Sequence, residues 1–213
     1  MLKEEDKVQI KKRLEEMDGK VTLLVFSQQV NVQCQYCSET ETLVNELVAL
    51  SDKLEAKILN FVTDKEEVEK YEIEKIPAIV IKGEKDLGIR YYGIPAGYEF
   101  ATLLDTILMV SKGESQLSEQ TKTQINDLKS DVHIQVFVTP TCPYCPRAAI
   151  TAYQLAMENE HIKAETIEVS EFPHLGQKYG VMGVPKIVIN ETQHFEGALP
   201  ESTFVQQVMT AVQ

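Results

Sequence analysis

The chain has 213 residues, of which 43% are hydrophobic and 25% are charged, and its 21 Lys and Arg against 33 Asp and Glu give a net charge of −12. This composition is typical of a globular protein, and the negative charge argues against binding to nucleic acid or to an anionic membrane surface. No apolar run reaches the roughly 18 residues of a membrane span, and the charged N-terminal segment has no signal-peptide pattern, so the sequence predicts a cytoplasmic protein.

Hydrophobic periodicity predicts that helices and strands alternate along the first half of the chain. Continuous apolar runs bounded by turn residues indicate buried strands, and amphipathic segments between them indicate helices. In chain order, we expect a helix over 3–17, a strand over 21–26, a helix over 38–53, a strand over 57–62, a helix over 65–71, a hairpin over 77–81 and 87–92, and a helix over 96–110.

The second half of the chain repeats this order of elements. We expect a helix over 117–128, a strand over 132–138, a helix over 142–158, a strand over 164–169, a helix over 172–179, a hairpin over 185–189 and 192–195, and a last helix ending near 212. A β-α-β crossover gives parallel strands and a short hairpin gives antiparallel ones, so each half predicts a mixed sheet with helices on its faces. The polar segment 111–116 is the expected junction, which divides the chain into residues 1–116 and 117–213.

All four cysteines lie in two Cys-x-x-Cys pairs, Cys34–Cys37 and Cys142–Cys145, which are 108 residues apart. Pro77 and Pro185 each follow the first cysteine of their own pair by 43 residues. A disulfide within Cys-x-x-Cys closes so short a loop that it is a weak structural staple, and stable disulfides are rare in the cytosol. The repeat therefore predicts two copies of one redox unit.

The position of each pair suits thiol–disulfide exchange, in which a thiolate is the nucleophile. In both halves the first cysteine is expected at the start of a helix, where unpaired backbone N–H groups and the helix dipole favour an anion. The second cysteine lies one turn further on, close enough to attack a mixed disulfide. We therefore predict Cys34 and Cys142 as nucleophiles, and Cys37 and Cys145 as resolving thiols.

Two X-Pro pairs stand directly before strands, at matching distances from the cysteines. An X-Pro bond can be cis at modest cost, and a cis bond turns the preceding carbonyl and N–H outward, where they can bind an extended peptide. The tyrosine inside each Cys-x-x-Cys pair can also contact a substrate, although a packed or surface aromatic is an equal alternative. The predicted substrate-binding residues are Ile76, Pro77, Val184, Pro185, Tyr36 and Tyr144.

These motifs resemble the thioredoxin superfamily. Residues 179–185 resemble the thioredoxin cis-proline segment, and residues 139–145 resemble the glutaredoxin active site. The order of the motifs, with CQYC first and CPYC second, and residues 88–97 are similar to the tandem-domain protein disulfide oxidoreductases of thermophilic prokaryotes. The glutaredoxin-like CPYC favours Cys142–Cys145 as the more active pair.

The resemblance implies an α/β fold of two tandem thioredoxin-like units, each a mixed four-stranded sheet with flanking helices. It implies dithiol–disulfide exchange on protein substrates, with reduction by a thioredoxin-reductase-like flavoprotein and with disulfide formation or isomerisation as further outcomes. No cofactor or metal is expected. The buried acid of thioredoxins has no clear match here, because Glu168 lies in the right neighbourhood but is expected to be a solvated surface residue.

Other functions stay open. Four thiolates can bind zinc, but structural zinc sites have their pairs closer in sequence than Cys37 and Cys142, and none of the four histidines is spaced to pair with another histidine or with a cysteine. An iron–sulfur scaffold would need further thiolates. A dedicated electron donor to a peroxiredoxin resembles the N-terminal module of alkyl hydroperoxide reductase flavoproteins, in which one unit alone keeps its cysteines. A binding or chaperone module would not need intact cysteines.

Overall fold

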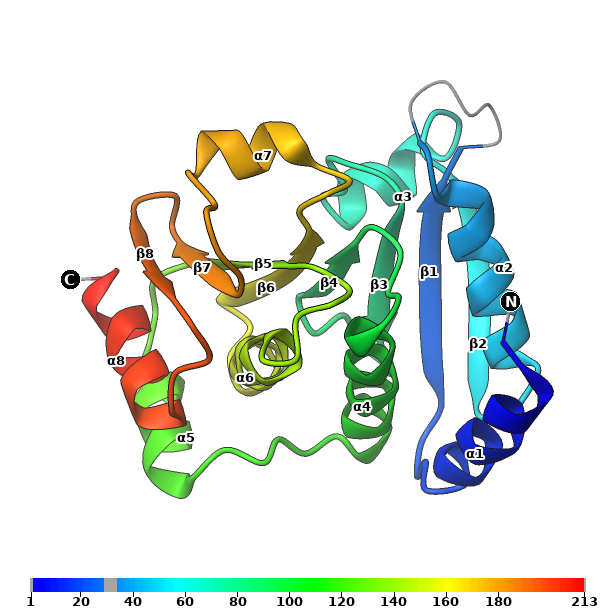
Figure 1. Ribbon diagram of the computed structural model, residues 1–213. Helices are drawn as coiled ribbons and strands as arrows, with labels where there is room; N and C mark the ends of the chain where they lie inside the picture. The colour runs from blue at the N-terminus through cyan, green and yellow to red at the C-terminus, as the bar shows by residue number, and fades with distance from the viewer. Residues whose placement is uncertain (1, 29–33, 213) are drawn as a thin grey trace.

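A computed structural model describes residues 2–28 and 34–212, and its elements follow the predicted order in both halves (Figure 1). The first half contains α1 (Glu4–Leu14), β1 (Val21–Ser27), α2 (Cys37–Val48), β2 (Leu54–Asn60), α3 (Lys65–Lys70), β3 (Ala78–Lys82), β4 (Ile89–Tyr92) and α4 (Tyr98–Lys112). The second half contains α5 (Glu119–Asn126), β5 (Val132–Val138), α6 (Cys145–Glu158), β6 (Ile162–Glu168), α7 (Pro173–Lys178), β7 (Lys186–Ile189), β8 (Gln193–Glu196) and α8 (Glu201–Thr210). None of the helices in the described residues is long and apolar enough to cross a membrane.

The strands form one mixed sheet in the order β2-β1-β3-β4-β6-β5-β7-β8. Each half supplies four neighbouring strands with the same pairing, one parallel pair and two antiparallel pairs, which confirms the predicted four-stranded sheets. The sequence did not predict that the two sheets join edge to edge. They do so through parallel pairing of β4 with β6, in which Tyr92 lies opposite Ile167. We propose the division at residue 116 and call the two parts the N-terminal and C-terminal units.

Helices cover both faces of this sheet. In β1, Leu23 and Val25 face the larger core, beneath α1, α2, α4, α5, α6 and α8, whereas Leu24 and Phe26 face a smaller core beneath α3 and α7. Figure 1 shows α3 and α7 on the side of the sheet opposite α4 and α6. Both cores contain residues of both units, so the units share their buried interior.

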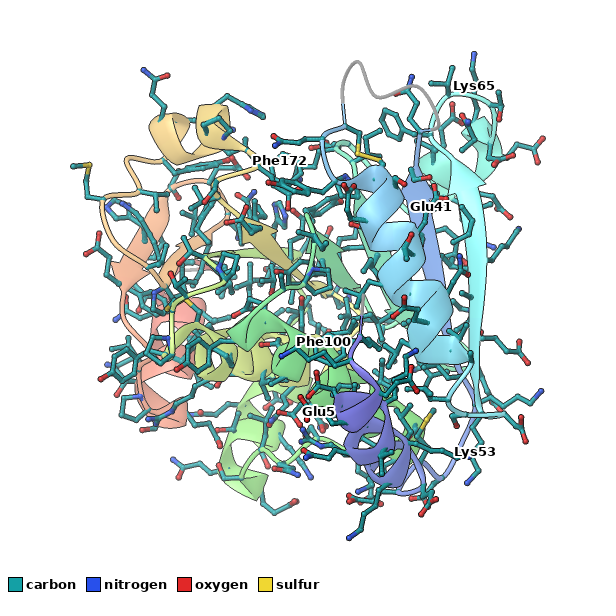
Figure 2. All side chains as sticks on the ribbon, turned by 45° about the vertical axis from the view of Figure 1, so that its right-hand side comes forward. Glu5, Glu41, Lys53, Lys65, Phe100 and Phe172 are labelled. Carbon is teal, nitrogen blue, oxygen red and sulfur yellow. A yellow bond between two sulfur atoms is a disulfide. The ribbon has the colours of Figure 1, made fainter. Side chains whose placement is uncertain are left out.

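Polar and aromatic contacts also cross the unit boundary. The ring of Phe172, labelled in Figure 2, meets the Tyr92 ring edge-on with 6.5 Å between centroids. Lys75 Nζ of the N-terminal unit lies 3.3 Å from Glu165 of β6, and His133 lies 3.2 Å from the same carboxylate. Burial opposes ionisation of Glu165, but His133 and Lys75 together hold its pKa below the ordinary value. The buried carboxylate is therefore compensated by Lys75 of the N-terminal unit and by His133 of its own unit.

A second buried carboxyl group at the boundary is not compensated in this way. Glu99 of α4 is fully buried, and neither of its oxygens has a hydrogen-bond partner among the described residues. Burial raises its pKa to about 7. Its charge raises the pKa of Tyr91 on β4 and of Tyr153 on α6, in addition to the larger effect of burial on both phenols, which places Glu99 where the two units meet.

We expect Glu99→Gln to stabilise the fold at alkaline pH. The folded pKa is above the unfolded one, so Glu99 favours folding at low pH and this contribution is lost as the pH rises through about 7. At about pH 8 the glutamine variant should be roughly 2 to 3 kcal/mol more stable, since one pKa unit corresponds to about 1.4 kcal/mol. Urea unfolding across this pH range measures the difference, with the exposed Glu69→Gln as control. An equal gain at pH 5 and pH 8 would contradict the assignment.

Candidate active sites

Each Cys-x-x-Cys pair is closed by a disulfide at the N-terminus of a helix. The helices α2 and α6 begin at Cys37 and Cys145, so the first cysteines precede the helices instead of starting them, which corrects the prediction. The reason is that Tyr36 and Tyr144 occupy the N-cap positions. The electrostatic argument still holds for Cys142, because the Cys145 N–H donates to Cys142 Sγ at 3.1 Å.

In both pairs, the first cysteine is more exposed than the second. Cys34 and Cys142 keep 3% and 6% of their surface exposed, whereas Cys37 and Cys145 keep 1% and 0%. A substrate disulfide can therefore approach the first cysteine of each pair more readily than the second. This order fits attacking and resolving thiols, and the assignment of these roles stays a prediction.

Both predicted proline segments lie beside their own cysteine pair. The Ile76–Pro77 and Val184–Pro185 peptide bonds are cis, both prolines are buried, and the residues before them are half-buried. The carbonyl oxygen of Val184 lies 3.7 Å from Cys142 Sγ. Ile76 lines the same cleft as Cys34. The structure thus brings each segment to one disulfide, and substrate binding by it remains a proposal.

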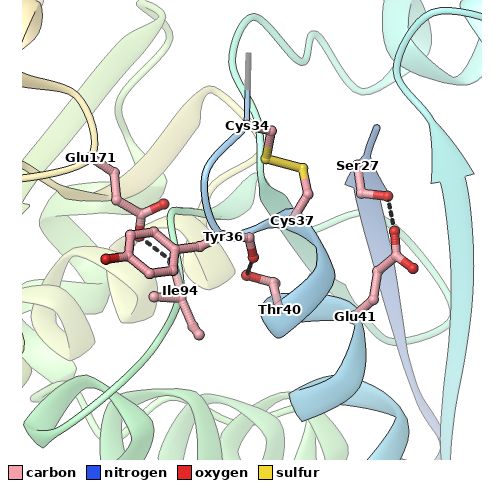
Figure 3. Close-up of a disulfide and its surroundings, with 8 residues drawn as sticks. All are labelled: Ser27, Cys34, Tyr36, Cys37, Thr40, Glu41, Ile94 and Glu171. Carbon is pink, nitrogen blue, oxygen red and sulfur yellow. Dashed lines mark hydrogen bonds between the residues drawn. A yellow bond between two sulfur atoms is a disulfide. The ribbon is translucent and has the colours of Figure 1, made fainter. Parts of the chain in front are cut away.

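The two tyrosines inside the cysteine pairs have different surroundings. Tyr144 is 69% exposed, whereas Tyr36 is half-buried. The Tyr36 carbonyl accepts hydrogen bonds from the N–H and the hydroxyl of Thr40, at 2.9 and 2.7 Å, in the first turn of α2 (Figure 3). A contact with substrate is therefore more accessible to Tyr144 than to Tyr36.

The N-terminal site opens into a cleft of about 390 Å³ that both units line. The N-terminal unit supplies its cysteine, the residue before Pro77 and several polar side chains, and the C-terminal unit supplies the turn before α7 and the start of that helix. The lining residues are Cys34, Gln35, Phe61, Glu74, Lys75, Ile76, Glu171, Phe172 and His174.

The loop before the C-terminal cysteine pair contacts the N-terminal unit. Tyr144 and Met182, which is 93% exposed, are among the large hydrophobic side chains that the described surface presents. The carbonyl of Pro140, two residues before Cys142, accepts the Tyr98 N–H at 2.9 Å at the start of α4. Gly97 has φ +59°, and a Cβ there would lie 2.2 Å from the same carbonyl oxygen.

Glu168 is buried, which corrects the expectation of a solvated side chain. Only 3% of it is exposed, and its carboxylate accepts the N–H groups of Ser170 and Glu171 at 3.2 and 2.9 Å. It is buried because β6 is an inner strand between β4 and β5, a consequence of the sheet joint that the sequence did not predict.

Three residues near the sites were missed by sequence reasoning: Gly97, Glu99 and Glu171. A glycine directly before a helix is a signal for an unusual backbone conformation, so Gly97 could have been found. The two glutamates could not, because each gains its surroundings from the other unit. Within the described residues, no three His, Cys, Asp or Glu side chains are grouped so that they could hold a metal ion.

Comparisons with known proteins agree with this geometry. A family model described as a thioredoxin domain matches residues 28–105 and 132–210. The crystal structure of a protein disulfide oxidoreductase from Aeropyrum pernix is 32% identical, with a TM-score of 0.93, and the match covers 99% of this chain and 94% of that one. The NTD_N/C domain of alkylhydroperoxide reductase AhpF from Enterococcus faecalis is 25% identical, with a TM-score of 0.89 over 98% of this chain and 100% of that one.

Among curated proteins, the NADH dehydrogenase of Ferdinandcohnia aciditolerans is 23% identical over 98% of this chain. The match covers 37% of that protein, so the chain spans little more than a third of its length. The family inferred from the repeated motifs is confirmed by the match in both halves. The chain belongs to the thioredoxin domain family and carries the domain twice in tandem.

Proposed function

We propose that this protein is a protein disulfide oxidoreductase that exchanges dithiols and disulfides on protein substrates through two sites. The observation that carries the proposal is the setting of Cys142. Its sulfur lies between the Cys145 N–H at 3.1 Å and the Val184 carbonyl at 3.7 Å, before a helix, at the more exposed end of a Cys-x-x-Cys disulfide. The likeness to the Aeropyrum pernix protein disulfide oxidoreductase supports the same function.

The proposed mechanism gives each group a role. In the reduced protein, Cys142 attacks one sulfur of a substrate disulfide, forms a mixed disulfide and releases the other sulfur as a thiol. The N–H of Cys145 and the start of α6 stabilise the attacking thiolate. Cys145 then attacks Cys142, which closes the protein disulfide and leaves the substrate reduced. Cys34 and Cys37 act in the same way in the other unit.

The direction of exchange depends on the redox partner, because reduction, oxidation and isomerisation share the mixed disulfide. We propose a thioredoxin-reductase-like flavoprotein as the electron source and disulfide-containing proteins as substrates. The cytoplasmic location stays a prediction of the sequence.

A second candidate is electron transfer to a peroxiredoxin. The likeness to the Enterococcus faecalis alkylhydroperoxide reductase domain over nearly the whole chain favours it. Peroxide consumption by a peroxiredoxin, with this protein as the dithiol donor, tests it. Elemental analysis of the reduced protein tests the zinc and iron–sulfur alternatives.

The proposed mechanism predicts that Cys145→Ser traps a covalent complex. Without the resolving thiol, reduced Cys145→Ser should accumulate a mixed disulfide between Cys142 and an insulin chain, whereas the parent should release reduced insulin. Mass spectrometry under non-reducing conditions measures the adduct, and Cys142→Ser with Cys145→Ser is the control that removes it. The absence of both insulin reduction by the parent and an adduct on the variant would refute the function.

A further inference from the structure

The C-terminal unit contributes a carboxyl group to the cleft of the N-terminal site. Glu171 lies in the turn between β6 and α7 and lines the cleft that holds Cys34. Its Oε1 accepts the N–H of Ile94, which follows β4 of the other unit, at 2.7 Å. Figure 3 shows Glu171 and Ile94 on one side of the Cys34–Cys37 disulfide and the Ser27–Glu41 hydrogen bond on the other.

The position of Glu171 is fixed by its surroundings. Its own N–H is held by Glu168 Oε2 at 2.9 Å. Gly93 has φ +100°, and a Cβ there would lie 2.7 Å from Glu171 Oε1, so glycine is needed for the carboxylate to reach Ile94. No described residue donates a hydrogen bond to Oε2, which leaves that oxygen for a group bound in the cleft.

The charges that face Glu171 are mostly negative. Burial, Glu168 of β6 and Glu39 of α2 raise its pKa to about 7. The cleft is also lined by Glu74, Lys75 and His174. Lys75 is already placed against Glu165 at 3.3 Å and over the Tyr92 ring at 3.7 Å, so it is not directed to Glu171 alone. A cation entering this cleft would meet a carboxylate that has no ion-pair partner among the described residues.

We propose that Glu171 is a specificity-determining residue of the N-terminal site, which selects disulfide substrates with a positively charged group beside the reacting sulfur. The proposal rests on the proposed function, and it makes the site composite, with its thiols from one unit and its charge selection from the other.

The test uses the full chain with Cys37, Cys142 and Cys145 each replaced by serine, so that Cys34 is the single thiol. The Cys34 thiolate attacks one sulfur of an added disulfide, the new S–S bond forms as the old one breaks, and the released thiolate takes up a proton. The probes are cystamine, which carries two ammonium groups, and neutral 2-hydroxyethyl disulfide. Mass spectrometry follows the mixed disulfide, and the ratio of the two rates cancels the ionisation of Cys34 itself.

We expect Glu171→Gln to lower the cystamine-to-neutral rate ratio about fivefold at about pH 8, as the loss of a partly exposed ion pair predicts. The fall should be smaller at about pH 6, where Glu171 is protonated, and smaller in high salt. Any change of the rate ratio with pH that is still seen in Glu171→Gln comes from His174 and the other charged groups of the cleft. The exposed Glu69→Gln, outside the cleft, should leave the ratio unchanged.

Two results would overturn the inference. If Glu171→Gln changed neither rate, the carboxylate would not meet the substrate cation. If it slowed both probes equally, so that their ratio stayed the same, Glu171 would only maintain the local structure. If Cys34 reacted with neither probe, the proposed exchange at this site would fail as well, and this outcome is distinct from the first two.

Discussion

Replacing Cys142 by serine is expected to remove most of the insulin-reducing activity, and replacing Cys34 is expected to remove the smaller share. Cys142 receives the Cys145 N–H at 3.1 Å, whereas no described residue donates to Cys34 Sγ. Cys142 also keeps 6% of its surface exposed against 3% for Cys34, which faces a cleft walled by the other unit. The difference should be about tenfold, because both sites stand at a helix N-terminus and one additional hydrogen bond to a thiolate contributes roughly 1.5 kcal/mol.

Insulin reduction with a dithiol as electron source measures these activities, with the variant lacking both Cys34 and Cys142 as the zero-activity control. Iodoacetamide titration of the reduced single variants gives the pKa of each remaining nucleophile. Equal losses in the two single variants would contradict the ranking of the sites. A larger loss in Cys34→Ser would reverse it.

Gly97→Ala should destabilise the fold and selectively impair the C-terminal site. The added methyl group would stand 2.2 Å from the Pro140 carbonyl oxygen, and an alanine at φ +59° is strained as well. Together these effects should cost roughly 3 kcal/mol or more. The clash pushes Pro140 away from α4, and Pro140 leads directly into the loop of Cys142.

The matched control is Gly113→Ala, because Gly113 has φ +67° but nothing within 4 Å of an added Cβ. Gly113 lies in the left-handed helical region, with ψ 16°, whereas Gly97 has ψ −128°. The control therefore has part of the backbone strain and none of the clash, and it should lose only about 1 kcal/mol. Urea unfolding measures stability, and insulin reduction with Cys34 replaced by serine measures the C-terminal site alone. The same loss of stability and activity in both glycine variants would show that contact with Pro140 is unimportant.

The fold was largely predictable because the same pattern of apolar runs and turn residues occurs in both halves of the chain. β5, a strand buried along most of its length, was predicted with its observed bounds, Val132–Val138. Among the strands, the poorest prediction was β2, expected over 57–62 and found at Leu54–Asn60. This strand lies at the edge of the sheet and buries only two of its seven residues, so its sequence carries little hydrophobic pattern.

The active-site cysteines could be predicted because their spacing is local and repeated. The residues whose surroundings come from the other unit could not. Glu168 looks like a surface residue until β6 is known to pair with β4, and Glu171 has no local motif at all. Tertiary pairing of two strand edges leaves no signal in a single sequence, and each of these side chains depends on that pairing.

The joint between β4 and β6 bears on how such a chain can be divided. If one half were produced alone, β4 or β6 would become an edge strand with unpaired backbone N–H and C=O groups, and parts of both hydrophobic cores would be exposed. Such an edge strand is a template for aggregation. Each unit covers the edge strand and the hydrophobic interior of the other, so loss of either unit would expose the remaining one to self-association.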